Sequence, residues 1–238
     1  MRLWRRTILH RYCELLYSVQ TGNAAWAHVH GSEVFDYMVE NPGHLEIFNR
    51  AMTDLTVSAA PAIVEAYDFS RFKKIVDIAG GHGYLLSQVV KSNPDLRGVL
   101  FDIEPVVAGA ETILEREGVK DRVELVAGNF FEAVPEGADV YLMKHIIHDW
   151  NDELSIKILR NIAVAMSSKS KLLIVEMVVP EGNEPHFSKL MDLGMLVLPG
   201  GVERTRDEYY MLLADAGLRL DRIIPTQIPL SILEAVKA

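Results

Sequence analysis

The sequence has little that would tie it to a membrane, to nucleic acid or to disulfide chemistry. Its single cysteine, Cys13, excludes an internal disulfide and fits a reducing cytoplasm. Lysine and arginine number 24 against 33 aspartates and glutamates, giving a net charge of −9, whereas a nucleic-acid partner needs clustered cations. No apolar run approaches the roughly 18 residues that span a bilayer. We therefore expect neither a nucleic-acid nor a membrane partner.

The rest of the composition is that of an ordinary globular protein. At 238 residues, 49% of them apolar, the chain can hold one domain with a full core and a small appendage. Its arginine-rich start carries no acid before Glu14, which faintly resembles an organellar presequence. We prefer an amphipathic helix there, because apolar residues recur at helical spacing. They are Leu3, Trp4, Ile8, Leu9, Tyr12, Leu15, Leu16 and Val19.

A glycine-rich turn is the most informative local feature. It runs from Asp77 to Gly83 and includes Gly80 and Gly81, between a strand-like and a helix-like run. Glycines allow the backbone to approach a ligand closely. Asp102 ends the next predicted strand, where a carboxylate can accept hydrogen bonds from two ribose hydroxyls. The pattern predicts a pocket for an adenosine-bearing cofactor.

The details of the turn favour one cofactor class. A dinucleotide fingerprint needs a third glycine, which is absent after Gly83. The carboxylate of Asp77 would repel a pyrophosphate but suits the cationic end of S-adenosylmethionine. A nucleotide, or a turn with no ligand, remains the alternative at this point.

From Arg71 onward, strand-like and helix-like runs alternate. This order predicts an α/β fold, with a doubly wound, mostly parallel, seven-stranded sheet between helices. The last two strands are joined too closely for a helical crossover and should form an antiparallel edge hairpin. The expected strands are 73–79, 97–103, 121–127, 138–144, 171–179, 218–226 and 228–236, and the expected helices are 84–92, 105–117, 152–168 and 206–216.

Residues 1–70 differ in character from the rest. They are predicted to form helices interrupted at Gly22, Gly31 and 41–43, with a long periodic stretch over 44–67. We therefore expect two units, a helical lobe over 1–70 and a catalytic, cofactor-binding domain over 71–238.

A histidine-containing segment follows the fourth predicted strand, at the edge where ligands bind in such sheets. A phenol has a pKa near 10 and is a poor nucleophile until a base takes its proton. Imidazole is largely neutral at pH 7 and suits that role. His148 is the candidate base, although a core or capping histidine is an equally ordinary interpretation, and His145 competes on chemistry alone.

Two acids could orient this base. Glu176 interrupts a buried strand and Glu203 lies in a glycine-containing turn. A buried acid is costly unless paired, so Glu176 could instead pair with a lysine or arginine. A metal site built by His148 with Asp149, Asp152 and Glu153 is a further alternative; we favour instead a helix cap at Asn151 or Asp152.

Taken together, these motifs resemble the class I S-adenosylmethionine-dependent O-methyltransferases, in particular the caffeate, acetylserotonin and bacterial polyketide group. The resemblance covers essentially the whole chain. The matching stretches are 19–22, 30–31, 35–37, 76–83, 101–102, 128–131, Lys144, 148–150 and 200–205.

The resemblance implies a Rossmann-like methyltransferase fold and roles for particular residues. It implies S-adenosylmethionine bound by the glycine-rich loop and Asp102, with His148 as base flanked by Glu176 and Glu203, and no metal. Asn129 and Phe130 border the adenine and Lys144 lies along it. In relatives the helix with Met191, Asp192 and Met195 lines the acceptor pocket, where a thioether suits an aromatic ring.

The sequence departs from the family pattern at three points. Ala79 stands where a glycine is usual, a change we expect to be tolerated. Asn129 stands where an aspartate is usual, yet its carbonyl oxygen can accept from the adenine amino group. Relatives also carry a winged-helix dimerisation domain before the point where this sequence begins, so 1–70 would be a remnant of that region.

We therefore expect an O-methyltransferase acting on a small phenolic, indolic or polyketide acceptor, with a possible homodimer through the N-terminal helices. Two rivals remain. One is a catalytically impaired cofactor-binding or assembly protein of the same fold; the other is a relative repurposed for decarboxylation or hydroxylation. The presence of His148 argues against the second rival.

Overall fold

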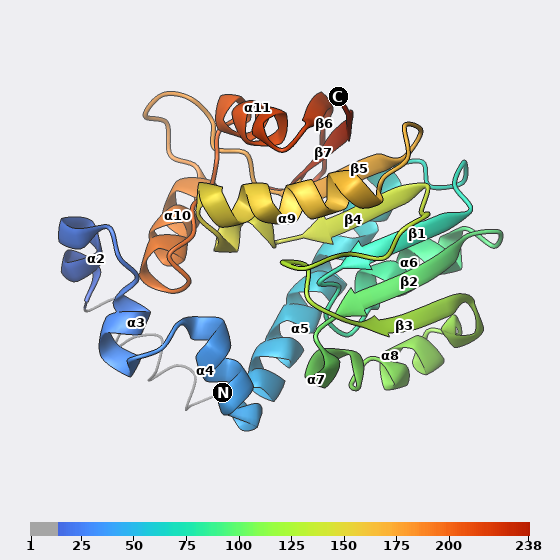
Figure 1. The fold of residues 1–238 in the computed structure, drawn as a ribbon, viewed down its shortest axis with the longest axis horizontal. Coiled ribbons are helices and arrows are strands. Elements are labelled where there is room, and N and C mark those ends of the chain that lie inside the picture. The colour runs from blue at the N-terminus through green and yellow to red at the C-terminus, as the bar shows by residue number, and fades with distance from the viewer. Residues whose placement is uncertain (1–13) are drawn as a thin grey trace.

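A seven-stranded sheet forms the centre of the structure, a computed structural model that describes residues 14–238 (Figure 1). The strand order is β3-β2-β1-β4-β5-β7-β6. Strands β1 to β5 pair in parallel, and β7 runs antiparallel to both β5 and β6. The predicted α/β fold with an antiparallel edge is therefore confirmed. The strands are β1 Lys74–Ile78, β2 Arg97–Asp102, β3 Val123–Ala127, β4 Val140–Lys144, β5 Lys171–Glu176, β6 Leu218–Pro225 and β7 Ser231–Lys237.

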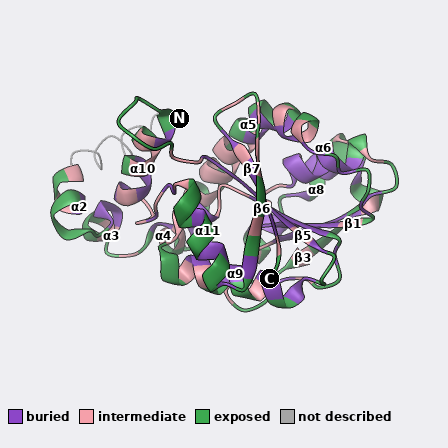
Figure 2. Cartoon of the chain, turned by 90° about the horizontal axis from the view of Figure 1, so that it is seen from above, coloured by how far each residue is buried: buried purple, intermediate pink, exposed green. Residues whose placement is uncertain are grey.

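Two apolar layers sandwich the sheet, because successive side chains of each strand point to opposite faces. Leu173 of β5 belongs to the apolar layer that includes α5, α6 and α8, whereas Leu172 belongs to the layer that includes α9 and α11. Figure 2 shows these two helix layers on either side of the sheet. Their helices are α5 Pro42–Ala66, α6 Tyr84–Ser92, α7 Glu104–Val107, α8 Glu111–Arg116, α9 Asp152–Ala165 and α11 Arg206–Asp215.

A helical lobe lies beside the sheet, but α5, which was predicted to belong to this lobe, packs on the sheet with α6 instead. Helices α2 (Leu15–Thr21) and α3 (Ala25–His30) each end at a glycine in the left-handed region, Gly22 and Gly31. Helix α4 (Val34–Glu40) packs Val34 and Met38 against Trp26. Helix α10 (Phe187–Val197) contacts α2 and α3, so the lobe also meets the C-terminal half of the chain.

The first 13 residues lie outside the described part of the chain, and with them the predicted helical positions Leu3, Trp4, Ile8, Leu9 and Tyr12. Within residues 14–238, no helix combines the length and apolar character that crossing a membrane requires.

One predicted helix is divided and one helix had no predicted extent, while the other elements agree with their predicted extents to within about three residues. The helix expected over 105–117 is split into α7 and α8 by a turn in which Gly109 approaches His82; a Cβ there would lie 2.8 Å from Nε2. Strand β5 ends at Glu176, and Val179 forms only an isolated bridge with Thr205. Helix α10 was expected only from the family resemblance, although Phe187, Leu190, Met191 and Met195 recur at helical spacing.

Candidate active site

The glycine-rich loop connects β1 to α6 at the carboxyl edge of the sheet. Ala79, Gly81 and Gly83 all have positive φ, at 52°, 60° and 75°. Ala79 therefore occupies a conformation that glycine adopts without strain, which explains why a glycine is usual there. A Cβ at Gly80 would lie 2.5 Å from Leu100 Cδ1 and 2.6 Å from Asp77 Oδ2, so only glycine fits. The loop thus exposes backbone where a ligand can approach.

Two carboxylates flank this loop. Asp102 Oδ2 accepts from Gly81 N at 2.8 Å and Oδ1 accepts from Ile103 N at 2.7 Å, and burial raises the pKa of Asp102 to about 6. Asp77 is buried, and its Oδ2 has no hydrogen-bond donor. Burial raises the pKa of Asp77 to about 7, although the charge of Lys144 opposes the rise. An unpaired buried carboxylate oxygen beside a glycine loop is suited to a cationic ligand.

The predicted adenine-side residues lie along the neighbouring loops. Asn129 Oδ1 accepts from Phe131 N at 2.9 Å, so the amide oxygen closes its own turn and keeps one lone pair for a ligand. Phe130 and Phe131 contact the Trp150 ring edge-on. Sequence reasoning assigned no role to Trp150, although it belongs to a family motif.

Trp150 also joins the sheet domain to the helical lobe. Its ring centroid lies 5.3 Å from that of Phe35 in α4. The aromatic cluster therefore extends from the loops after β3 and β4 into the lobe. Only a tertiary contact brings Phe35 there, since it lies far from Trp150 in sequence.

His148 is buried in a short 3₁₀ turn, Ile147–Asp149, after β4. Its Nδ1 lies 2.7 Å from Glu203 Oε1, and its Nε2 lies 3.7 Å from Asp149 Oδ1. Because a carboxylate only accepts, Nδ1 carries a hydrogen, and in the neutral ring Nε2 has the lone pair that can take a proton. Burial lowers the pKa of His148, but the charge of Asp149, the Glu203 hydrogen bond and the charge of Glu176 outweigh it and raise this pKa to about 9.

Glu176 makes its hydrogen bonds to the turn rather than to the imidazole ring. Its Oε1 accepts from the backbone nitrogens of Ile146, Ile147 and His148 at 3.0, 2.6 and 3.2 Å. Its Oε2 accepts from the hydroxyl of Tyr209. Of the two acids expected to orient the base, only Glu203 has a hydrogen bond to the ring, because the side chain of Glu176 is occupied by the backbone of the turn.

His145 lies next to the candidate base but in different surroundings. Its ring stacks on that of His148 with centroids 5.0 Å apart, and its Nδ1 lies 3.3 Å from Lys144 Nζ. Burial and the charges of Lys144 and His148 lower the pKa of His145 well below its usual value. His145 has no carboxylate partner, so the structure gives different surroundings to two histidines that compete on residue chemistry alone.

The turn over 200–205 holds Glu203 against His148. Val202 N donates to His148 O at 2.9 Å, and a Cβ at Gly201 would collide with that oxygen. Asp192 Oδ1 accepts from Glu203 N at 2.8 Å. Asp192, expected as a pocket residue, therefore fixes the backbone of Glu203.

Met191 and Met195 lie on the same helix, α10. Met191 is partly buried against the core and Met195 is buried. Neither is joined to His148 by a hydrogen bond, and the structure brings them near the site only through α10 and the 200–205 turn.

Two polar residues at the start of α9, Asn151 and Asp152, have structural contacts. Asn151 caps α9 by accepting from Leu154 N at 3.0 Å, and Asp152 pairs with buried Arg204 at 2.8 Å. In the part of the chain that the structure describes, no three histidine, cysteine or acidic side chains are grouped to hold a metal ion.

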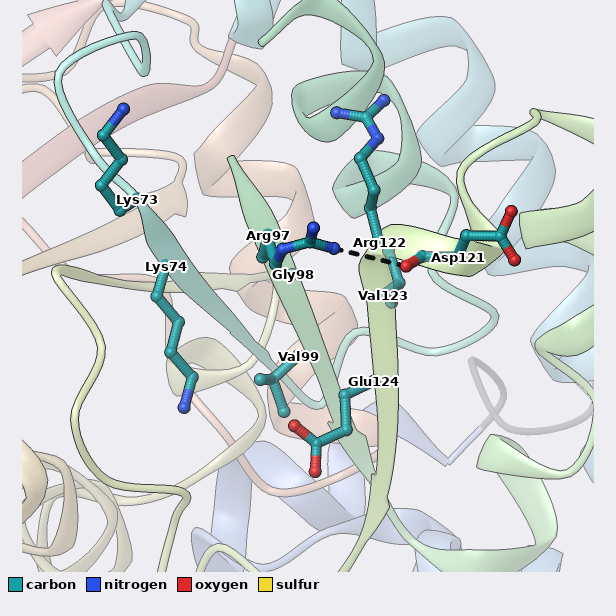
Figure 3. A pocket seen from close by; sticks show the side chains of 9 residues that line it. All are labelled: Lys73, Lys74, Arg97, Gly98, Val99, Asp121, Arg122, Val123 and Glu124. Carbon is teal, nitrogen blue, oxygen red and sulfur yellow. Dashed lines mark hydrogen bonds between the residues drawn. The ribbon is translucent and has the colours of Figure 1, made fainter. Parts of the chain in front are cut away.

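A separate hollow of about 380 Å³ opens at the amino ends of β1, β2 and β3, away from the candidate site (Figure 3). Its lining mixes four cations with Asp121 and Glu124, and Arg97 donates to the Asp121 carbonyl at 3.4 Å. None of the predicted site residues lines it. A second hollow, of about 330 Å³, lies between α5 and His82 of the glycine loop.

Comparison with known proteins adds to this geometry. Residues 12–219 match the O-methyltransferase domain family. The phenazine O-methyltransferase PhzM of Lysobacter antibioticus is 46% identical over 224 residues, which cover 94% of this chain and 66% of that protein. A mitomycin biosynthesis 6-O-methyltransferase of Streptomyces lavendulae is 42% identical over 213 residues, covering 89% of this chain and 60% of the relative. The chain thus spans less than two thirds of the length of these curated relatives.

A solved structure from neocarzinostatin biosynthesis has a similar fold. This O-methyltransferase, NcsB1, superposes with a TM-score of 0.90 at 30% identity, over 98% of this chain and 69% of that one. It was determined in complex with S-adenosylmethionine and 2-hydroxy-5-methyl naphthoic acid.

Proposed function

Because the chain belongs to the O-methyltransferase domain family, we propose that it transfers a methyl group from S-adenosylmethionine to a hydroxyl of a small aromatic acceptor of secondary metabolism. One observation carries the proposal. His148 is paired through Nδ1 with Glu203 at 2.7 Å, which leaves Nε2 to take a proton at the carboxyl edge of the sheet, where the glycine loop also lies. A metal is not required for this chemistry.

The residues of the loop fit the cofactor. When bound, S-adenosylmethionine supplies a methyl group already activated by its sulfonium charge. The unpaired Oδ2 of Asp77 would accept from its ammonium group, and Asp102 would accept from the ribose hydroxyls. Gly80, Gly81 and Gly83 let the backbone approach. Asn129, Phe130 and Lys144 would border the adenine side.

The proposed role of His148 follows from its surroundings. The acceptor hydroxyl would give its proton to Nε2, and the imidazolium that forms would be stabilised by Glu203 and Asp149. The pKa of His148, about 9, is close to that of a phenol, near 10. Transfer of the proton from the phenol to Nε2 therefore costs little free energy. Alignment of the acceptor with the methyl group supplies the rest of the rate enhancement.

The acceptor class is supported by relatives and by α10. NcsB1 was solved with a naphthoic acid, and PhzM is named for phenazines. Met191 and Met195 of this chain offer polarizable thioethers for a flat ring. We infer that phenols and fused-ring hydroxyaromatics are the acceptors to test first.

A second copy of the chain is the proposed partner of the lobe. Helix α2 exposes Leu16 and Val19, and α10, which contacts α2, exposes Phe187 and Leu190. Exposed apolar side chains on two helices that contact each other favour self-association. Pairing through it would make a homodimer.

A methyl-transfer screen tests the proposal. The chain is incubated with methyl-deuterated S-adenosylmethionine and panels of phenols, indoles, naphthols, phenazines and aromatic amines, and products are read by mass spectrometry. We expect a labelled methyl ether with at least one hydroxyaromatic and S-adenosylhomocysteine in equal amount. Cofactor binding without any methylated product would support the non-catalytic rival, and methylation of amines alone would overturn the O-acceptor assignment.

A further inference from the structure

Tyr209 is a buried tyrosine whose hydroxyl points at the candidate catalytic turn. It lies in the first turns of α11, has no exposed surface, and donates from its hydroxyl to Glu176 Oε2. Burial and the carboxylate of Glu176 raise the pKa of Tyr209 well above its usual value. The hydroxyl therefore keeps its hydrogen at every working pH and is the donor in this contact. The next residue, Tyr210, is 57% exposed.

The other oxygen of the same carboxylate holds the turn that carries the base. Glu176 Oε1 accepts from three consecutive backbone nitrogens, those of residues 146–148, at 2.6 to 3.2 Å. The carboxylate thus bridges α11 on one side and the His148 backbone on the other. Its orientation decides whether Oε1 can meet three donors at once.

We propose that Tyr209 is a positioning residue for methyl transfer, which fixes the Glu176 carboxylate and through it the place and the electrostatic surroundings of His148. The proposal rests on the proposed function of His148 as base. Without the hydroxyl, Oε2 would be a buried carboxylate oxygen with no donor, which is costly. The carboxylate would then rotate or admit water, and the three backbone hydrogen bonds would weaken.

The charged groups around His148 and Tyr209 determine how the pKa of His148 should respond when the Tyr209 hydroxyl is lost. His148 faces the carboxylates of Asp149, Glu176 and Glu203 and the ring of His145, with Lys144 close by. Tyr209 faces Glu176, Glu203 and the guanidinium of Arg204. Since the charge of Glu176 helps to hold the pKa of His148 up, a displaced or partly hydrated Glu176 should let that pKa fall.

The experiment compares Tyr209→Phe with Tyr210→Phe, a matched loss of one hydroxyl on the same helix. The pKa of the His148 imidazole is measured by NMR titration, with the resonance assigned through His148→Gln. Turnover and KM are measured with an acceptor found in the screen. For Tyr209→Phe we expect a lower His148 pKa, a fall in kcat of about 5- to 30-fold and a nearly unchanged KM for the cofactor, as for a lost hydrogen bond to a charged group. Tyr210→Phe should match the wild type in the His148 pKa, in kcat and in KM.

The NMR measurement keeps this proposal separate from the proposed function. If the wild type methylates nothing, the proposed function fails, while a His148 pKa lowered only in Tyr209→Phe still supports the positioning role. A folded Tyr209→Phe with the wild-type His148 pKa and kcat contradicts the proposal. Additive effects of Tyr209→Phe and Glu176→Gln on kcat in a double-mutant cycle would also contradict the proposal, because residues that act through one contact must couple.

A second variant covers the case in which Tyr209→Phe does not fold. Site-specific 3-fluorotyrosine at position 209 keeps the ring and the hydroxyl but makes the hydroxyl a stronger donor. The Glu176 carboxylate is then held more firmly beside the His148 turn, so the His148 pKa should rise, opposite to the fall expected when the hydroxyl is lost. An unchanged titration curve in this variant would overturn the proposal.

Discussion

Glu203 accepts a 2.7 Å hydrogen bond from His148 Nδ1, and this single contact distinguishes the two histidines of the 145–148 segment. It fixes the tautomer, so that Nε2 has the free lone pair. His145 has a lysine beside the corresponding nitrogen instead, at 3.3 Å. A lysine ammonium destabilises the protonated ring, whereas a carboxylate stabilises it. Only His148 is therefore equipped to accept and hold a proton.

Replacing His148 by glutamine should lower kcat by about 10²- to 10⁴-fold, the usual range for the loss of a general base. Cofactor affinity should stay nearly intact, because the loop residues are untouched. The matched change, His145→Gln, should lower kcat much less. Steady-state kinetics and calorimetry on both variants check this. Equal losses in the two variants, or no partial rescue of His148→Gln by a pre-ionised acceptor at high pH, would show that the base is misassigned.

The pH dependence of turnover should follow the raised pKa of His148. A base must be neutral to accept a proton, so kcat should rise with pH and level off above about 9. Glu203→Gln removes one of the carboxylates that stabilise the imidazolium. The midpoint of the pH–rate profile should therefore move to lower pH, and the plateau value of kcat should be lower. A pH–rate profile of each protein provides the test. A midpoint that stays in place, or moves upward, would mean that Glu203 does not act on this histidine.

Asp102→Ala should weaken S-adenosylmethionine binding by roughly 10- to 100-fold, corresponding to about 1.5–3 kcal/mol for hydrogen bonds to a charged group. The loss has two causes. The proposed acceptor for the ribose hydroxyls disappears, and Gly81 N loses its 2.8 Å partner. Asp95→Ala, an exposed acid paired only with Lys73, is the control and should bind normally. Unchanged calorimetric affinity in a folded Asp102→Ala would remove Asp102 from the site.

The parts of the site that follow from local chemistry could be predicted from the sequence. The run from Asp77 to Gly83 needs glycine because of backbone geometry, and Asp102 ends a strand that pairs with β1. Alternating strand-like and helix-like runs predicted a mostly parallel sheet, since parallel neighbours need helical crossovers, but they did not predict the order of the strands. Those features depend on residues near one another in the chain.

The rest depends on contacts between distant residues, which one sequence does not reveal. Asp192 fixes the backbone of Glu203, and Tyr209 holds the carboxylate of Glu176. Each pair links elements that only the folded chain brings together. The catalytic and cofactor roles of the site residues stay predictions until the variants above are measured.

The stability of the edge hairpin should depend on Glu234 in a defined pH range. Glu234 is buried and accepts from Tyr67 at 2.8 Å, Lys171 at 2.9 Å and Arg222 at 2.8 Å. Burial alone would raise the pKa of Glu234, but these donors lower it to about 2. A carboxyl with a lowered pKa in the folded state stabilises that state above its unfolded pKa, near 4.5, and this stability is lost as pH falls towards 2.

Glu234→Gln should therefore reduce the free energy of unfolding at pH 7 by about 1–3 kcal/mol, because charged hydrogen bonds to a buried group are lost. The variant should also lose less stability than the wild type between about pH 4.5 and 2. Denaturant unfolding at several pH values measures both effects. Glu181→Gln, at an exposed loop position, should follow the wild-type curve. Parallel pH curves for wild type and Glu234→Gln would rule out this linkage.

Self-association should depend on α2. Leu16 is 66% exposed and Val19 of the same helix is 62% exposed, and α2 contacts α10, which exposes Phe187 and Leu190. Burying such a surface against a second copy is favourable by about 25 cal/mol per Å² of apolar area, whereas a charge there must be desolvated. We expect sedimentation to show a dimer for the wild type and a shift towards monomer for Leu16→Glu. The control is Val164→Glu on α9, whose residue is 76% exposed on another face; it should leave the dimer unchanged. A monomeric wild type, or equal dissociation by both variants, would show that this surface does not join two copies.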